Sequence, residues 1–190
     1  MPDTSSKSFG LAIAYLLPGF IGLWAVSLFD TGTQRWLGRA AQAPTTVGDF
    51  FFAVVASLGA GVFLSSVRWI VFDRFLNRTV FKKRLGKQPD LDFGKPGEDA
   101  AKLAALDRYV VDHYQYYQFN SNTAVALAIA YVAWTLSGVV TRGLVPSASA
   151  SVGVLVILAG VEWILIQSAV GCLESYRKKT THLLGLRGAA

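Results

Sequence analysis

The sequence predicts an all-α integral membrane protein with four transmembrane helices, and three observations support this fold class. Of its 190 residues, 53% are hydrophobic and only 16% are charged, and the mean hydropathy is +0.41. The apolar residues also form long blocks, whereas an amphipathic helix of a soluble protein shows a single apolar stripe. Finally, the basic residues gather in alternate connecting segments, as expected for a chain with a fixed orientation in a membrane.

Four apolar blocks predict the membrane spans. Crossing the hydrocarbon core of a bilayer takes about 20 apolar residues at 1.5 Å per residue. A soluble bundle could bury one such block, but four in 190 residues would leave it too little polar surface. The first block is longer than the apolar region of a signal peptide, about 7–15 residues, so we expect it to be retained. The predicted spans are residues 9–29, 48–70, 118–140 and 151–173.

The first span carries Pro18 and Gly19 near its middle. Proline removes one backbone hydrogen bond, which predicts a kink or a locally unwound turn. The kink could serve packing alone, or it could act as a hinge for gating. Small residues also recur along every span and predict close packing between helices. They include Gly10, Ala14 and Gly22 in the first span, Ser57, Gly61 and Ser65 in the second, Ala126 and Ala130 in the third, and Gly153 and Gly160 in the fourth.

Residues 71–117 are predicted to form a cytoplasmic helical hairpin. No glycine or proline interrupts residues 68–84, and helical spacing resumes after a glycine- and proline-rich loop. We therefore expect the second and third spans to continue as helices of about 35–40 residues that pair as a stalk. The hairpin is also the candidate binding site for a cytosolic protein or a small ligand. The basic residues proposed for that contact are Lys82, Lys83, Arg84 and Lys87.

The distribution of lysine and arginine predicts the orientation. Ten of the 18 basic residues lie between Arg68 and Arg108, and four more follow the last span. The positive-inside rule then places both termini and the hairpin in the cytoplasm. The net charge of +6 is explained by this orientation. Nucleic-acid binding is not expected, because the sequence has no phosphate-binding loop and no recognition motif.

Three polar residues within or at the ends of the spans are candidates for a pore or an intramembrane polar site. Glu162 lies near the middle of the fourth span, where an ionised carboxylate costs about 2.5–3.5 kcal/mol on insertion scales. It could be neutral and hydrogen-bonded to a neighbouring helix, or it could belong to an ion or proton pathway. Asn120 and Asn122 open the third span, and they could line a vestibule or be ordinary interfacial residues.

The remaining polar and aromatic residues indicate neither catalysis nor a bound cofactor. A run of aromatic residues between Tyr109 and Phe119 is typical of the aromatic belt at a membrane interface, although a ligand-stacking platform is the alternative. His113 and His182 are the only histidines and Cys172 is the only cysteine. Paired histidines, nucleophile motifs and cysteine pairs are therefore missing from the sequence. We expect no enzyme, no metal and no cofactor.

The layout resembles small four-span inner-membrane proteins of bacterial anti-phage defence systems. The residues that carry the resemblance are LLPGF, RWIVFDRFLNR and DRYVVDHYQYYQF, together with the size and the basic hairpin. It implies a multi-pass protein of the bacterial inner membrane, either an effector that permeabilises the membrane or a sensor with a cytosolic partner. We therefore expect a homo-oligomer in the lipid bilayer that forms or gates an ion-conducting pore. The alternative is a non-conducting sensor or scaffold that recruits a cytosolic partner through the hairpin.

Overall fold

The computed structural model describes residues 4–39, 46–85, 100–142 and 148–183, and these residues are helical apart from turns and short connections. The elements follow one another along the chain with no strand in the described ranges. In chain order they are α1 (Thr4–Val26), α2 (Thr31–Trp36), α3 (Val47–Arg68), η1 (Trp69–Leu76), α4 (Asn77–Thr79), α5 (Lys82–Leu85), α6 (Ala100–Tyr109), η3 (Val110–Tyr114), α7 (Gln115–Arg142) and α8 (Ala148–Leu183).

Two of these helices are long and apolar enough to cross a membrane. They are the continuous rod Val47–Thr79, which joins α3, η1 and α4, and Val152–Leu183 within α8. A shorter apolar helix spans Ile13–Val26. The prediction of an all-helical chain is thus confirmed, as are two helices able to span a bilayer, at the second and fourth predicted spans. The remaining spans and the orientation stay predictions.

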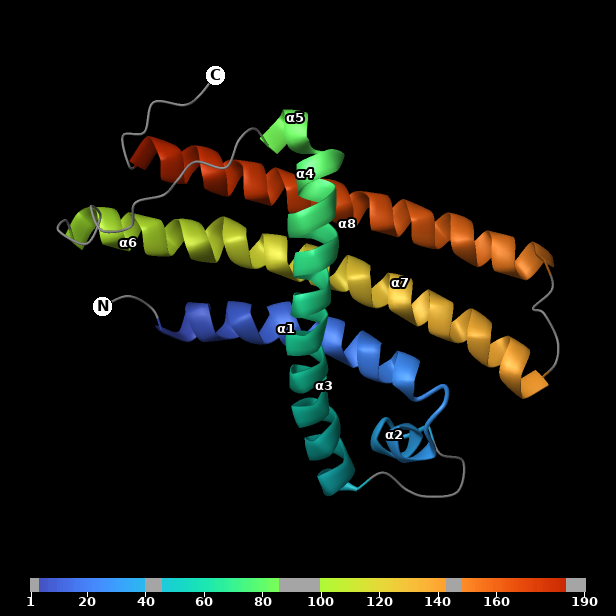
Figure 1. Cartoon of the computed structure of the whole chain (residues 1–190). Helices are drawn as coiled ribbons and strands as arrows, with labels where there is room; N and C mark the ends of the chain where they lie inside the picture. The colour runs from blue at the N-terminus through green and yellow to red at the C-terminus, as the bar shows by residue number, and fades with distance from the viewer. Residues whose placement is uncertain (1–3, 40–45, 86–99, 143–147, 184–190) are drawn as a thin grey trace.

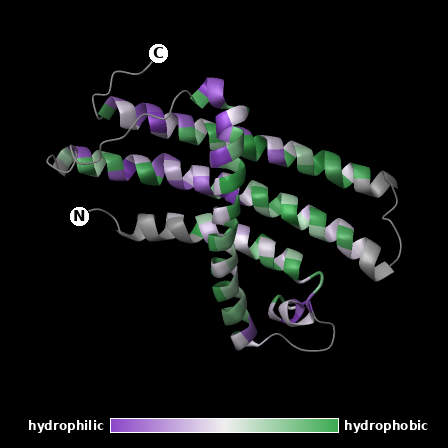
Figure 2. Cartoon of the chain, viewed as in Figure 1, coloured by the Kyte–Doolittle hydropathy of each residue, from purple (hydrophilic) through white to green (hydrophobic). Residues whose placement is uncertain are grey.

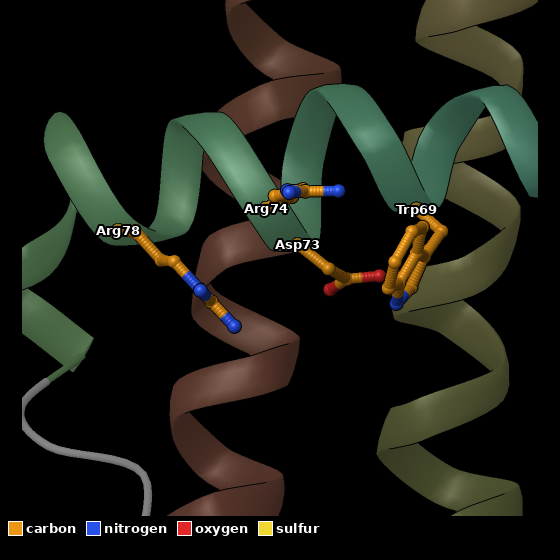
Figure 3. Close-up of a pocket in the computed structure, with 4 residues that line it drawn as sticks. All are labelled: Trp69, Asp73, Arg74 and Arg78. Atoms are coloured by element: carbon orange, nitrogen blue, oxygen red, sulfur yellow. The ribbon is translucent and has the colours of Figure 1, made fainter.

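The helices are arranged as three rods crossed by a fourth (Figure 1). α1, α7 and α8 run roughly alongside one another, and α3 with its continuation runs across them. α3 packs mainly against α1, whereas α7 lies between α1 and α8 and packs on both. The same crossing is visible from another direction in Figure 3, where two helices pass behind the rod.

Polar and apolar residues are separated along the rods (Figure 2). Hydrophilic residues gather on α5, on α6 and on the C-terminal part of α8, whereas the N-terminal half of α8 and much of α3 are hydrophobic. Many large apolar side chains of these hydrophobic parts are exposed, as expected for surfaces that contact lipid. On α8 they are Val152, Val154, Leu155, Val156, Ile157, Val161, Trp163 and Ile164.

α1 ends at Val26, three residues before the predicted end of the first span, and a short helix follows. The hydroxyl of Ser27 donates to the carbonyl of Trp24 at 2.7 Å and accepts a 2.8 Å hydrogen bond from the Arg39 guanidinium, which holds the turn. Asp30 then caps α2 by accepting from the backbone N–H of Thr33 at 2.6 Å. A hydrogen bond from the Thr33 hydroxyl, and after it this backbone hydrogen bond, lowers the pKa of Asp30.

The start of α3 agrees with the prediction to one residue because its sequence contains a complete capping box. The hydroxyl of Thr46 accepts from the backbone N–H of Asp49, and the Asp49 carboxylate accepts from the backbone N–H of Thr46 at 2.9 Å. Two of the unsatisfied donors at a helix N-terminus are thereby satisfied. The rod then continues for 33 residues to Thr79.

The predicted uninterrupted helix from the second span to Arg84 is wrong in its last turns. The rod ends at Thr79, a turn follows at Val80 and Phe81, and α5 starts at Lys82. Neither glycine nor proline marks this break. Contacts with α8 account for it, since Leu85 is buried and its carbonyl accepts a 3.3 Å hydrogen bond from Arg177.

α6, η3 and α7 form one continuous rod of 43 residues, slightly longer than the predicted length of about 35–40 residues. Its extension packs against α8, through both α6 and η3. α5, α6 and η3 all contact the C-terminal half of α8, which was not part of the predicted stalk.

Candidate functional site

Glu162 lies on the side of α8 that faces the protein. Ala169 and Leu173 lie on this side and are buried, while Trp163 and Ile164 next to Glu162 are exposed. The carboxyl group is half-buried, and its Oε1 atom is buried without a hydrogen-bond partner among the described residues. An acidic group in this position lacks the compensation that buried polar atoms normally have.

Asn120 of α7 donates to the hydroxyl of Ser168 of α8 at 2.9 Å, which links the two helices six residues along α8 from Glu162. This polar contact does not include Glu162, whose buried Oε1 atom has no hydrogen-bond partner among the described residues.

Asn120 and Asn122 are both used for packing between helices. In addition to the Asn120 contact with Ser168, the side-chain amide of Asn122 donates to the backbone carbonyl of Ala14 in α1 at 3.1 Å. Both asparagines are buried, and Asn122 is completely so. The structure therefore places them as links from α7 to its two neighbours and does not bring either of them to Glu162.

Pro18 and Gly19 lie where α1 meets α3. Both residues are buried inside the continuous helix α1. A Cβ atom added to Gly19 would lie 1.7 Å from the backbone oxygen of Ser57, and one added to Gly61 would lie 2.1 Å from the backbone oxygen of Tyr15. The predicted packing through small residues is confirmed here, whereas the hinge at Pro18 and Gly19 stays a prediction.

The most extensive polar arrangement is a network that the sequence analysis missed. It joins Arg68, Asp73 and Asn77 of the α3–α4 rod to Tyr117 of α7. Arg68 is only 5% exposed, and its Nη1 atom lies 3.1 Å from the Asp73 carboxylate. The Tyr117 hydroxyl donates to the same carboxylate and accepts from the Asn77 amide at 3.3 Å.

The network is completed by a contact between the arginine and an aromatic ring. The Arg68 guanidinium lies 5.2 Å from the centre of the Tyr117 ring, at a distance typical of cation–π pairs. Its Nε and Nη1 atoms are buried without an aligned hydrogen bond. Arg68 is consequently held by charge and by the ring, and its attachment to the fold depends on Asp73.

The π-helical geometry of η1 explains why this pair was missed. Arg68 and Asp73 are five residues apart, which in an α-helix places them about 140° apart around the axis. In a π-helical segment the backbone bonds join residues i and i+5, and this brings the two side chains to the same side. Only an i, i+5 search for opposite charges would have found the pair.

The predicted aromatic belt is only partly realised. Tyr116 is exposed, but Tyr117 is fully buried. Tyr114 lies between Tyr117 and Tyr176 of α8, with ring centres 5.9 Å and 5.3 Å away. These tyrosines form the core beneath the Arg68 network, so the run of aromatic residues contributes to packing between the helices.

The predicted partner-binding residues differ in what they do. Arg84 is committed to α8, because its Nε lies 2.9 Å from Glu174 and its Nη1 donates to Gln167 at 2.8 Å. It therefore anchors α5, and its proposed role in binding a partner stays a prediction. Lys82 and Lys83 are exposed, and Lys87 lies outside the described residues.

His113 of η3 pairs with Lys179 of α8, and the two nitrogen atoms are 2.6 Å apart. Desolvation first, and then the positive charge of Lys179, lowers the pKa of His113. The ring is therefore neutral at physiological pH and accepts from the lysine. Among the residues that the structure describes, no group of histidine, cysteine and acidic side chains could hold a metal ion.

Comparison with protein-family models, with curated proteins and with solved structures finds no match.

Proposed function

We propose that the chain is an oligomeric inner-membrane protein that conducts ions along a pathway containing Glu162. The observation that carries this proposal is the half-buried carboxyl of Glu162, whose Oε1 atom is buried without a hydrogen-bond partner in the described part of the chain. Acidic groups at such a depth are costly, and they generally mark ion or proton pathways. In this proposal a permeating cation, or a proton, supplies the missing partner.

The exposed half of α8 supports association of several copies. Gly153 and Gly160 are seven residues apart on this helix, and a Cβ atom added at either position would meet nothing within 4 Å. Small residues of this kind let two membrane helices approach closely. We propose that α8 of one copy packs here against a second copy, while Glu162, about 180° around the helix from Gly153, stays on the side of α8 that faces its own subunit.

The proposal retains four spans with both termini in the cytoplasm. Helices that cross steeply cannot all follow the bilayer normal, so α3 has to turn towards the direction of α1, α7 and α8. The tight contact between Gly19 and the α3 backbone near Gly61 provides the point about which it would turn. The exposed lysines Lys82 and Lys83 would then lie on the cytoplasmic side.

Labelling of single cysteines from either side of the membrane checks this orientation. In a Cys172→Ser background, Thr79→Cys and His182→Cys are expected to react only from the cytoplasmic side. Gly32→Cys and Gly48→Cys are expected to react only from the opposite side. If Gly48→Cys and Thr79→Cys reacted from the same side, α3 would not cross the membrane.

Ion flux into liposomes tests the function itself. We expect wild-type protein to conduct cations, and Glu162→Gln to lose most of its cation selectivity, because the amide keeps the shape of the side chain but not its charge. Glu162→Asp keeps the charge and is the matched control, expected to remain selective. Wild-type selectivity in Glu162→Gln would exclude Glu162 from the pathway.

The second candidate function is a non-conducting sensor or scaffold, favoured by the exposure of Lys82 and Lys83 in α5. It predicts no flux in the same liposomes under any activating condition, and the experiment therefore separates the two candidates. A role in anti-phage defence belongs to the first proposal as its biological setting, in which conduction would be held off until a cytoplasmic signal arrives.

A further inference from the structure

We infer that the rod Val47–Thr79 binds the headgroup and one acyl chain of an anionic phospholipid at η1. The inference goes beyond ion conduction and rests on two parts of the proposed function, that this rod lies in a membrane and that η1 is at its cytoplasmic side. It starts from a pocket of about 330 Å³ that is lined by Trp69, Asp73, Arg74 and Arg78 (Figure 3).

Two arginine side chains line the pocket and can bind the same anionic group. Arg74 and Arg78 are four residues apart, both are exposed, and neither forms an ion pair with another described residue. The carboxylate of Asp73 also lines the pocket and would repel an anion if it were free. It is engaged instead with Arg68 and with the Tyr117 hydroxyl, so the pocket keeps the positive charge of its two arginines.

A second and larger cavity adjoins the pocket on the same rod. It measures about 580 Å³ and shares Trp69 with the first, and it extends along α3 towards the middle of the predicted span. Its lining is mainly uncharged, with the exception of the buried Arg68. The lining residues are Tyr15, Val62, Ser65, Ser66, Arg68, Trp69 and Ile70.

The two cavities together match a phospholipid in shape and polarity. From Val62 to Arg74 the rod rises about 18 Å, at 1.5 Å per residue, which is close to the depth of one leaflet of hydrocarbon, about 15 Å. Trp69 is 54% exposed between them, at the level where tryptophan commonly lies in the interface. A phosphate held by Arg74 and Arg78 would therefore place an acyl chain past Trp69 and along Val62.

The predicted orientation makes the inference specific for anionic lipid. The positive-inside rule places Arg74 and Arg78 at the cytoplasmic leaflet, which contains anionic lipids. Each basic residue near this surface raises the affinity for anionic headgroups about fivefold. Guanidinium groups also bind phosphate oxygens in a bidentate manner. A soluble phosphate would satisfy the arginines but would leave the apolar cavity beside Trp69 empty.

Retention of lipid by the purified protein tests the inference. The protein is prepared in nanodiscs of phosphatidylcholine doped with phosphatidylglycerol, transferred to detergent, and examined by native mass spectrometry. We expect about one retained phosphatidylglycerol per chain in preference to phosphatidylcholine. Arg74→Gln/Arg78→Gln is expected to reduce the affinity about 25-fold, from two charges at about fivefold each.

The matched control is Lys82→Gln/Lys83→Gln, which removes the same charge from exposed residues near the pocket. It is expected to retain lipid as the wild type does. An equal loss in this control would show unspecific attraction to the surface and would overturn the inference, as would equal retention of phosphatidylcholine. Displacement of the lipid by millimolar glycerol phosphate would assign the arginines to a soluble phosphate and would overturn it too.

Trp69 gives a readout that does not depend on mass spectrometry. Phosphatidylglycerol with a brominated acyl chain is expected to quench the fluorescence of the wild-type protein more than that of Trp69→Phe. Thermal unfolding of every variant in the same detergent verifies the fold, since the substituted side chains are exposed. If the wild type and Trp69→Phe were quenched equally, Trp69 would not contact the acyl chain, and this part of the inference would be wrong.

Discussion

Gly61→Ala is expected to separate α1 from α3 and to lower the thermal stability of the protein strongly. The added methyl group would lie 2.1 Å from the backbone oxygen of Tyr15, and its nearest neighbours are all backbone atoms of that residue. A backbone cannot move aside as the end of a flexible side chain can. Overpacking typically costs about 1–3 kcal/mol, and we expect a value at or above the upper end of this range.

Gly59 of the same helix is the matched control for this prediction. A Cβ atom added at Gly59 meets nothing within 4 Å, so Gly59→Ala leaves the contact with α1 unchanged. It is expected to be neutral or to stabilise slightly, because alanine favours the helix by about 0.5–1 kcal/mol over glycine. Unfolding of both variants in detergent, followed by circular dichroism, makes the comparison. Equal melting temperatures for the two variants would contradict the tight crossing.

Asp73→Asn is expected to be the most destabilising polar substitution in the described part of the chain. It leaves the guanidinium of Arg68, which is 5% exposed, without its opposite charge. Removing one partner of a buried ion pair costs about 3–5 kcal/mol, because the remaining charge stays desolvated. The Tyr117 hydroxyl would also lose the carboxylate to which it donates, which weakens the attachment of α7 to the rod.

The control for this prediction is Asp112→Asn, which removes a carboxylate from an exposed ion pair. Asp112 and Arg108 are 50% and 81% exposed, and pairs of this kind contribute about 0–1 kcal/mol. A double substitution, Arg68→Met with Asp73→Leu, is expected to recover much of the loss, since it removes the buried charge altogether. Chemical denaturation provides the free energies of unfolding. Equal losses for Asp73→Asn and Asp112→Asn would show that the network contributes little.

The features that could be predicted from the sequence are those that depend on local patterns. The long helices follow from uninterrupted apolar blocks, and the start of α3 follows from the capping box at Thr46 and Asp49. α2 was within reach of the same reasoning, because Asp30 followed by Thr33 is a capping pattern.

The features that could not be predicted depend on contacts between distant parts of the chain. The break at Val80 arises from the attachment of α5 to α8 by Arg84 and Leu85, and no local signal marks it. The course of α3 across the other helices likewise depends on where its glycines meet α1. At Glu162 the sequence identified the residue, but only the structure shows that its Oε1 atom is buried without a hydrogen-bond partner among the described residues.

The π-helical segments η1 and η3 have a consequence for how the two long rods present their surfaces. A turn closed by i to i+5 bonds holds one residue more than an α-helical turn, so the residues beyond it are rotated by about 100° relative to an uninterrupted α-helix. A helical wheel that treats all of Val47–Thr79 as an α-helix therefore shows residues from two different faces of the rod as one stripe. The apolar half and the polar half of each rod are out of phase. Substitutions that share one stripe of the wheel therefore lie on different faces in the two halves of the rod.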